Sequence, residues 1–470
     1  MDLEDTIEGA GRLSVQGPSP LRVGQAGTWR VTFRLGERTT IETGGEVRFS
    51  VEREFAPPQV ADPARAGYTT VETTAEGVRL ELIRGHTFPD LLDECGFAEA
   101  TRRYETDFAV RRRGSFNRGV NLFAVVREGA LGPGDEVTLV YGDAREDARG
   151  AGVLVSARME RRIGFRVAID PDGRARAPYS GFSQAGRCWV ELGAGEPERL
   201  LVVAPSVVGV GEPVRLNVAL FDGDRLLCRH FEGDVRVEVA AGGPVAVNRR
   251  HACLTHAHGG HIRLHVAAVA TAPGVARLRV TGPGGLCGIS NPIVVRPSGD
   301  GCPRVFWGDI HLHSRHSDGP ASIGPADYYR IARDVYGLDF ASVTDHDAEL
   351  VYRIGPDDWR EFQQAAREFN LPGEFVTLLG YEYSERLIDG DRNVYFLRDD
   401  APIFRSCDSD SDSPEKLWAK LAPLEAMTVP HHTVSNWIGA GFDHHDAQIL
   451  SLIHISEPTR PLYISYAVFC

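Results

Sequence analysis

The chain has few cysteines for its 470 residues, and none of them forms a CxxC pair. Of the eight, seven are scattered between Cys95 and Cys407 and one is the last residue, Cys470. This spacing is typical of reduced thiols and argues against a disulfide scaffold. The acidic start, Met1–Asp5, is not followed by the apolar segment of a signal peptide. We therefore expect a cytoplasmic protein.

Long apolar runs and an excess of positive charge are also missing. No apolar stretch approaches the length of about 20 residues that a membrane-spanning helix needs. The net charge is −14, which disfavours nonspecific binding to nucleic acid or to an anionic membrane. Bound metal ions would reverse the charge locally, so a nucleic-acid substrate is only weakly opposed. The sequence also lacks the GxSxG, P-loop and dinucleotide-binding motifs.

Alternating apolar and polar residues predict β-structure over most of the first 300 residues. Trp29–Arg34 and Val47–Val51 show this period of two, and we expect residues 1–195 to form a β-rich N-terminal domain. Residues 196–298 contain several short segments of the same kind, which predict an immunoglobulin-like β-sandwich. Five histidines between His251 and His265 suit an exposed hairpin better than a metal site, because no carboxylate in this segment completes a ligand set.

From residue 303 onward, four short apolar segments each lead to residues of the types that bind metals. Helical periodicity separates them over Asp327–Tyr336 and Trp359–Asn370, and alternating strands and helices predict a parallel sheet or barrel. The chemistry of such folds collects at the carboxyl ends of the strands. The candidate metal ligands at these ends are His311, His313, Asp318, His346, Glu382, His431 and His432.

The spacing of His311 and His313 places both imidazoles on one side of an extended segment. Alone, the pair could be ordinary polar residues at a strand end; with His346 and Glu382 following, we expect a metal site. Imidazole and carboxylate ligands suit Zn, Mn or Fe. Asp318 could be a ligand or the N-cap of the next segment. His316 could contact substrate phosphate or face solvent.

The order of these motifs resembles the polymerase and histidinol phosphatase (PHP) family over about residues 303–449, most of all its branch of unknown function, DUF3604. The resemblance lies in His311-x-His313 with Ser317-Asp318-Gly319, in Thr344-Asp345-His346 and in Gly380-Tyr381-Glu382. It implies a PHP-type (β/α)7 barrel holding two or three divalent ions, with Glu382 and His346 as catalytic residues. Asp309 and Asp345 are expected to orient imidazoles by accepting their N–H groups.

The last 21 residues, 450–470, resemble an in-frame translation of a sequencing adapter, although a genuine apolar strand is the alternative. On the first interpretation the PHP-like domain, 303–449, is truncated. Its barrel would be incomplete and would lack the late Asp-x-His ligands of the family. We therefore expect this fragment itself to be inactive, whatever the activity of the complete protein.

The leading functional hypothesis is metal-dependent hydrolysis of a small-molecule or polymeric phosphate ester. The runner-up is another metal-dependent hydrolysis, such as that of an amide, because a fold does not fix a substrate. A third possibility is a binding protein in which the β domains recognise a polysaccharide or a protein and the PHP-like module is inactive. The sequence does not indicate the oligomeric state.

Overall fold

The computed structural model divides the chain into two compact units, each described separately below. Unit 1 comprises Met1–Val305 with the short segments Pro320–Ser322 and Asp334–Gly337, and unit 2 comprises the remainder from Phe306. In the part of the chain that the structure describes, no helix combines the length and the apolar character needed to cross a bilayer. The described residues are 4–6, 10–96, 99–100, 102–103, 119–145, 150–152, 162–174, 183–241, 243–299, 301, 304–320, 322–349, 352–385 and 390–430.

The N-terminal part of unit 1 is built from strands with one apolar face. In β4 (Trp29–Leu35), every second side chain from Trp29 onward is buried. These side chains share one core with Phe49 and Phe165. The first sheet has the order β1 (Glu4–Thr6), β12 (Ser183–Glu191), β11 (Arg162–Asp170), β5 (Glu46–Val51), β8 (Val120–Glu128) and β7 (Arg79–Arg84). The second sheet has the order β2 (Gly11–Gln16), β4, β9 (Glu136–Tyr141) and β6 (Thr69–Thr73). A separate pair is formed by β3 (Ala26–Gly27) and β10 (Ala151–Gly152), and helix α1 (Phe88–Cys95) follows β7.

The second part of unit 1 consists of two further sheets around a separate core. Val214, Leu216, Val218 and Leu220 of β15 (Pro213–Phe221) are all fully buried in it. One sheet has the order β13 (Arg199–Val203), β15, β19 (His261–Ala270) and β17 (Val245–Val247). The other has β14 (Val207–Gly209), β22 (Ile293–Arg296), β20 (Gly274–Thr281), β16 (Gly233–Ala241) and β18 (His251–Leu254), with β21 (Cys287–Ile289) on β20 and the 3-10 turns η1 (His256–His258) and η2 (Pro283–Gly285) in the connections.

The histidine-rich segment does not form the hairpin expected from its sequence. β18 pairs with β16, whereas β19 pairs with β15 in the other sheet. The turn at Gly259 and Gly260, both with positive φ, therefore carries the chain from one sheet to the other. A sequence spacing that suits a two-stranded hairpin also suits such a crossing, because both need only a tight turn.

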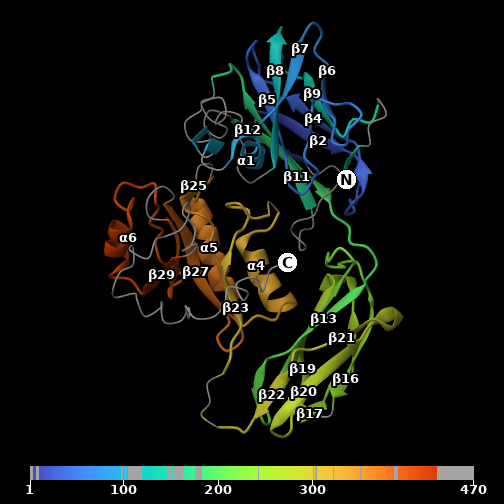
Figure 1. Ribbon diagram of the computed structural model, residues 1–470, viewed down its shortest axis with the longest axis vertical. Helices are drawn as coiled ribbons and strands as arrows, with labels where there is room; N and C mark the ends of the chain where they lie inside the picture. Colours follow the sequence, from blue (N-terminus) through green and yellow to red (C-terminus); the bar gives the residue numbers. More distant parts are fainter. Residues whose placement is uncertain are drawn as a thin grey trace. The chain divides into compact units, whose positions relative to one another are not determined.

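Unit 2 contains one mixed five-stranded sheet (Figure 1). Its first three strands are parallel, and β28 is antiparallel to both of its neighbours. The strand order is β23 (Gly308–Leu312), β24 (Phe340–Val343), β27 (Val376–Glu385), β28 (Gly390–Phe396) and β29 (Ala426–Pro430), and a separate pair is formed by β25 (Ala348–Glu349) and β26 (Tyr352–Arg353).

The predicted fold class, an all-β region followed by an incomplete (β/α)7 barrel, is therefore wrong. The chain is predominantly β, with several separate sheets, and the described residues contain no (β/α)7 barrel. The physical reason lies between residues 385 and 390. This connection is too short for a helical crossover, so β28 runs back beside β27. A barrel of parallel strands would need a helix at that point.

The helices α4 (Pro325–Arg330) and α5 (Pro356–Phe369) lie side by side against the sheet of unit 2 (Figure 1). The chain continues from α4 as one π-helical turn, Ile331–Val335, and Gly337 follows with positive φ, as expected for a residue that ends a helix. The predicted helix over 359–370 is confirmed as α5, which buries Trp359, Phe362, Ala365, Ala366 and Phe369.

The helix expected near Pro414 is also confirmed. It is α6 (Pro414–Leu421), and its N-cap is Ser413, whose side chain accepts a hydrogen bond from the backbone N–H of Lys416. Leu417 and Leu421 bury its inner face in the core of unit 2. The serine and aspartate residues just before this helix therefore have a local structural role.

Candidate metal centre

The candidate site lies at the carboxyl ends of β23, β24 and β27. Glu382 on β27 stands between Tyr381 and Tyr383, which are buried in the core beside α5. Because side chains alternate along a strand, Glu382 points to the opposite face of the sheet. His346 comes three residues after β24, and its backbone continues the parallel pairing as a bridge to Glu382. Strand pairing thus brings two candidate ligands 36 residues apart in sequence side by side.

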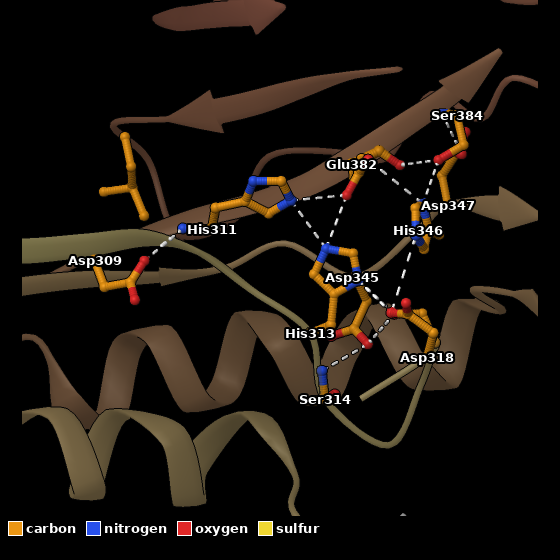
Figure 2. A network of polar contacts seen from close by, with 12 residues as sticks. Asp309, His311, His313, Ser314, Asp318, Asp345, His346, Asp347, Glu382 and Ser384 are labelled. Atoms are coloured by element: carbon orange, nitrogen blue, oxygen red, sulfur yellow. Dashed lines mark hydrogen bonds and ion pairs between the residues drawn. The ribbon is translucent and has the colours of Figure 1, made fainter. Parts of the chain in front are cut away.

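Glu382 meets both histidines of the His-x-His motif (Figure 2). Its Oε2 lies 3.0 Å from Nε2 of His311 and 2.8 Å from Nε2 of His313, and the two Nε2 atoms are 3.0 Å apart. Ligand atoms about 2.1 Å from a shared ion would lie about 3.0–3.4 Å apart in octahedral or tetrahedral coordination. Three lone-pair atoms at these separations repel one another unless positive charge is shared among them. The donor types and their spacing therefore fit a divalent cation.

Asp318 extends this group toward His346. Its Oδ1 makes a short contact with Nδ1 of His313 and lies 3.9 Å from Nε2 of His346. It is presented by the loop 314–319, which folds back so closely that a Cβ at Gly319 would lie 1.9 Å from the carbonyl oxygen of His313. The N-cap of α4 is Gly324, so Asp318 does not cap that helix.

Within the described residues, three sets of side chains each bring their ligand atoms within 4.8 Å of one another, and all three lie in unit 2. They are His311 with His313 and Glu382, His313 with Asp318 and His346, and His346 with Glu382 and Asp391. Because neighbouring sets share members, they form one continuous cluster. The sequence analysis did not identify Asp391. No alternation of polar and apolar residues marks this segment, because Asp391, Arg392 and Asn393 are all polar, so the sequence held no strand signal that would have identified it.

Burial and exposure differ across the cluster. The side chain of Glu382 is 1% exposed, whereas that of His311 is 35% exposed, so the cluster is open to solvent on the His311 side. Burial lowers the pKa of His313, but its hydrogen bonds to Asp318 and Glu382 outweigh this effect and raise the pKa well above its usual value. In the metal-free protein, the raised pKa favours the doubly protonated, positively charged form of His313, which supplies the positive charge that a bound cation would otherwise supply.

The two carboxylates expected to orient imidazoles contact the backbone and the ligand loop. Asp309 accepts a hydrogen bond from the backbone N–H of His311, and burial raises the pKa of Asp309. Asp345 is fully buried and accepts hydrogen bonds from Ser314 N at 2.9 Å and Ser317 Oγ at 2.7 Å. Asp345 thus holds both ends of the turn that precedes Asp318.

His316 anchors the same loop to helix α5. Its Nε2 lies 3.0 Å from Oε2 of Glu361 and its Nδ1 lies 3.3 Å from Oδ1 of Asp358. Arg315 donates to both oxygens of Glu361, at 2.6 and 2.7 Å. The hydrogen bond from His316 lowers the pKa of Glu361 despite its partial burial. His316 therefore serves the attachment of the loop, which neither sequence interpretation anticipated.

Some expected features lie outside the described residues. These are the candidate ligands His431 and His432 and the segment 450–470. β29 ends at Pro430, which lies opposite Arg392, the neighbour of Asp391 on β28. Strand β29 therefore ends at the same end of the strands as the cluster.

Comparison with known proteins finds a family model that matches part of the chain and a remote relative, and neither description states an activity. A family model described as "Protein of unknown function (DUF3604)" matches residues 335–444. An uncharacterized protein of Chlamydia pneumoniae is 24% identical over 146 residues, which are 31% of this chain and 23% of that protein. The chain thus spans about a quarter of the length of this curated relative.

Solved structures with detectable similarity are remote. The adhesin InvE of Yersinia pseudotuberculosis aligns over 62% of each chain, with 8% identity and a TM-score of 0.18. InvD of the same organism aligns over 63% of this chain and 61% of that chain, with 9% identity and a TM-score of 0.21. Similarity at this level gives no information about function.

Proposed function

We propose that this chain carries the site of a metal-dependent hydrolase that acts on a phosphate ester. The observation that supports the proposal most directly is the meeting of His311 Nε2, His313 Nε2 and Glu382 Oε2 within 3.0 Å of one another. Two imidazoles and a carboxylate are the ligand set of many catalytic sites for zinc and related ions. Sharing of Glu382 between neighbouring sets favours more than one cation, because its two carboxylate oxygens can bind two ions.

Individual residues of the cluster would have different roles in such a site. Buried Glu382 contributes negative charge at the base of the cluster, and half-buried His311 faces the solvent from which a substrate would arrive. A bound divalent cation would supply Lewis acidity, a water ligand of lowered pKa and charge to neutralise the phosphate. Arg315, within the ligand loop, is held by both oxygens of Glu361. Its charge is compensated inside the protein, so charge for the substrate would come from the metal centre.

The order of motifs along the chain supports a phosphate ester as the substrate class. His311-x-His313, Thr344-Asp345-His346 and Gly380-Tyr381-Glu382 occur in the order seen in PHP phosphoesterases. The mixed sheet places residues of all three motifs in one cluster. The matched family description states no activity, so the resemblance in the order of motifs is the basis for choosing a phosphate ester over an amide.

The test combines metal content with substrate preference. We expect the purified chain, reconstituted with Zn, Mn or Fe and passed through a desalting column, to retain at least one equivalent of metal. We expect any turnover to favour p-nitrophenyl phosphate over matched p-nitrophenyl esters and anilides. His311→Ala should lose both metal and turnover, whereas Glu368→Gln, an exposed change on α5, should not. Failure to retain metal, or preference for the ester or anilide, would contradict the proposal.

A further inference from the structure

A second group of polar side chains lies immediately behind His346 (Figure 2). Nδ1 of His346 is 2.6 Å from Oγ of Ser384, and the backbone N–H of Ser384 donates to Oδ1 of Asp347 at 2.9 Å. His346, Ser384 and Asp347 are 7%, 6% and 0% exposed, so water does not compete for these contacts. This arrangement connects an expected metal ligand to two residues to which no role has been given.

Asp347 accepts hydrogen bonds from three segments of the chain, and one of them is the backbone of Ser384. Its carboxylate accepts hydrogen bonds from the backbone N–H groups of Ala348, Ser384 and Ser406 and from the hydroxyl of Ser406. These residues belong to three separate segments of unit 2. The carboxylate therefore ties the segment after β24 to β27 and to the loop that contains Ser406.

The position of the serine proton decides which nitrogen of His346 carries a hydrogen. The hydroxyl of Ser384 has an acceptor of its own in the backbone oxygen of Glu382, at 3.4 Å, which allows its lone pairs to accept from Nδ1 of His346. A second acceptor, Oε1 of Glu382, lies 3.6 Å from the same nitrogen. Nε2 faces Oδ1 of Asp318 at the longer distance of 3.9 Å. Both contacts at Nδ1 favour the Nδ1–H tautomer.

We propose that Ser384 is a positioning residue that fixes His346 as the Nδ1–H tautomer and thereby presents the Nε2 lone pair to a cation shared with Asp318. The inference rests on the proposed function, in which His346 is a metal ligand. A neutral imidazole binds a metal only through the nitrogen that carries no hydrogen. The other tautomer would direct an N–H group at the cation. Asp347 supports this choice by holding the backbone of Ser384.

The first experiment reads the tautomer without any metal. In metal-free protein labelled with 15N at histidine, two-bond 15N–1H correlations distinguish Nδ1–H from Nε2–H, and the His346→Gln variant assigns the signal. We expect Nδ1–H in the wild-type protein and in Ser384→Thr, which keeps the hydroxyl. We expect a mixture or the other tautomer in Ser384→Ala. Ser342→Ala is the matched control, since Ser342 is also buried and its hydroxyl also donates to a backbone oxygen, that of Leu378.

The second experiment measures the affinity for Zn and Mn by competition with a chromophoric chelator. Loss of a hydrogen-bond partner behind a ligand imidazole costs about 10–100-fold in metal affinity, so we expect at least about tenfold weaker binding in Ser384→Ala. Ser384→Thr and Ser342→Ala should stay near the wild-type affinity. A wild-type Nε2–H signal, or wild-type affinity in Ser384→Ala, with normal metal uptake would overturn this inference alone. No metal uptake by the wild-type chain would overturn the proposed function and, with it, the inference.

Discussion

Asp391 lies directly opposite Ser384 in the antiparallel pair formed by β27 and β28. Directly opposed residues of a strand pair point to the same face of the sheet, and Glu382, two residues from Ser384, points to that face as well. This relationship explains how Asp391 comes to lie with His346 and Glu382 in one set of potential ligands. It also places a buried carboxylate, 2% exposed, where a second cation would be held.

We expect Asp391→Asn to reduce the number of bound metal ions by one without abolishing binding. The substitution keeps the size of the side chain but removes its charge, and the set formed by His311, His313 and Glu382 does not include this residue. Metal per protein, measured by plasma mass spectrometry after reconstitution, is the readout. Unchanged stoichiometry would show that Asp391 is structural. Asp399→Asn, on the exposed loop after β28, serves as the control.

Glu382→Gln should have a larger effect, because Glu382 belongs to two of the three sets. The near-isosteric amide removes the negative charge shared by both imidazoles of the His-x-His motif. We expect metal retention and any turnover to fall at least about 100-fold, as for loss of a residue in direct contact with the ion. Glu368→Gln makes the same chemical change on the exposed side of α5 and should have no effect. Equal metal retention in the two variants would rule out Glu382 as a ligand.

Phe362→Ala should destabilise unit 2 by about 3–5 kcal/mol, since it removes a large side chain from a packed core. Phe362 is 1% exposed and its ring lies 5.8 Å from that of Trp359 and 5.2 Å from the imidazole of His316. Chemical denaturation provides the measurement. Glu368→Ala, on the exposed face of the same helix, should change stability by less than about 0.5 kcal/mol. A similarly small change for Phe362→Ala would mean that α5 is not packed as described.

The stability of the metal-free protein should depend on pH through Asp347. Burial raises the pKa of Asp347 from 3.8 to about 6, although hydrogen bonds from Ser406, Ser384 and Ala348 oppose the rise. Between about pH 4 and pH 6 the folded state therefore binds more protons than the unfolded state. The stabilising contribution of the protonated group is complete below about pH 4 and is lost as the pH rises through 6.

Asp347→Asn isolates this effect because the amide does not titrate. A shift of about two pKa units corresponds to about 3 kcal/mol, so the difference in unfolding free energy between wild type and variant should change by about that amount from pH 4 to pH 7. The wild-type protein should lose stability relative to the variant as the pH rises. Denaturation in the presence of a chelator gives the two curves. Parallel curves would show that Asp347 ionises normally in the folded protein.

The parts of the site that could be predicted from sequence depend on short-range geometry. His311 and His313 point to the same side because side chains alternate along a strand, and five apolar residues of α5 share a face because a helix repeats every 3.6 residues. The start of α6 follows from the serine that caps it. Each of these features is fixed within a few residues, so the order of the amino acids was enough to identify it.

The tertiary structure decided the rest. No local feature of Gly390–Phe396 indicates that this strand runs antiparallel to β27. The antiparallel pairing makes the sheet mixed and places Asp391 in the ligand cluster. Glu382 meets His311 across 71 positions of sequence, and the contact depends on the register of strands paired through β24. Register and strand direction are set by which long-range pairing buries the most apolar surface and satisfies the most backbone hydrogen bonds. That balance belongs to the whole folded sheet, whereas residue type and spacing determine which side chains are available to it.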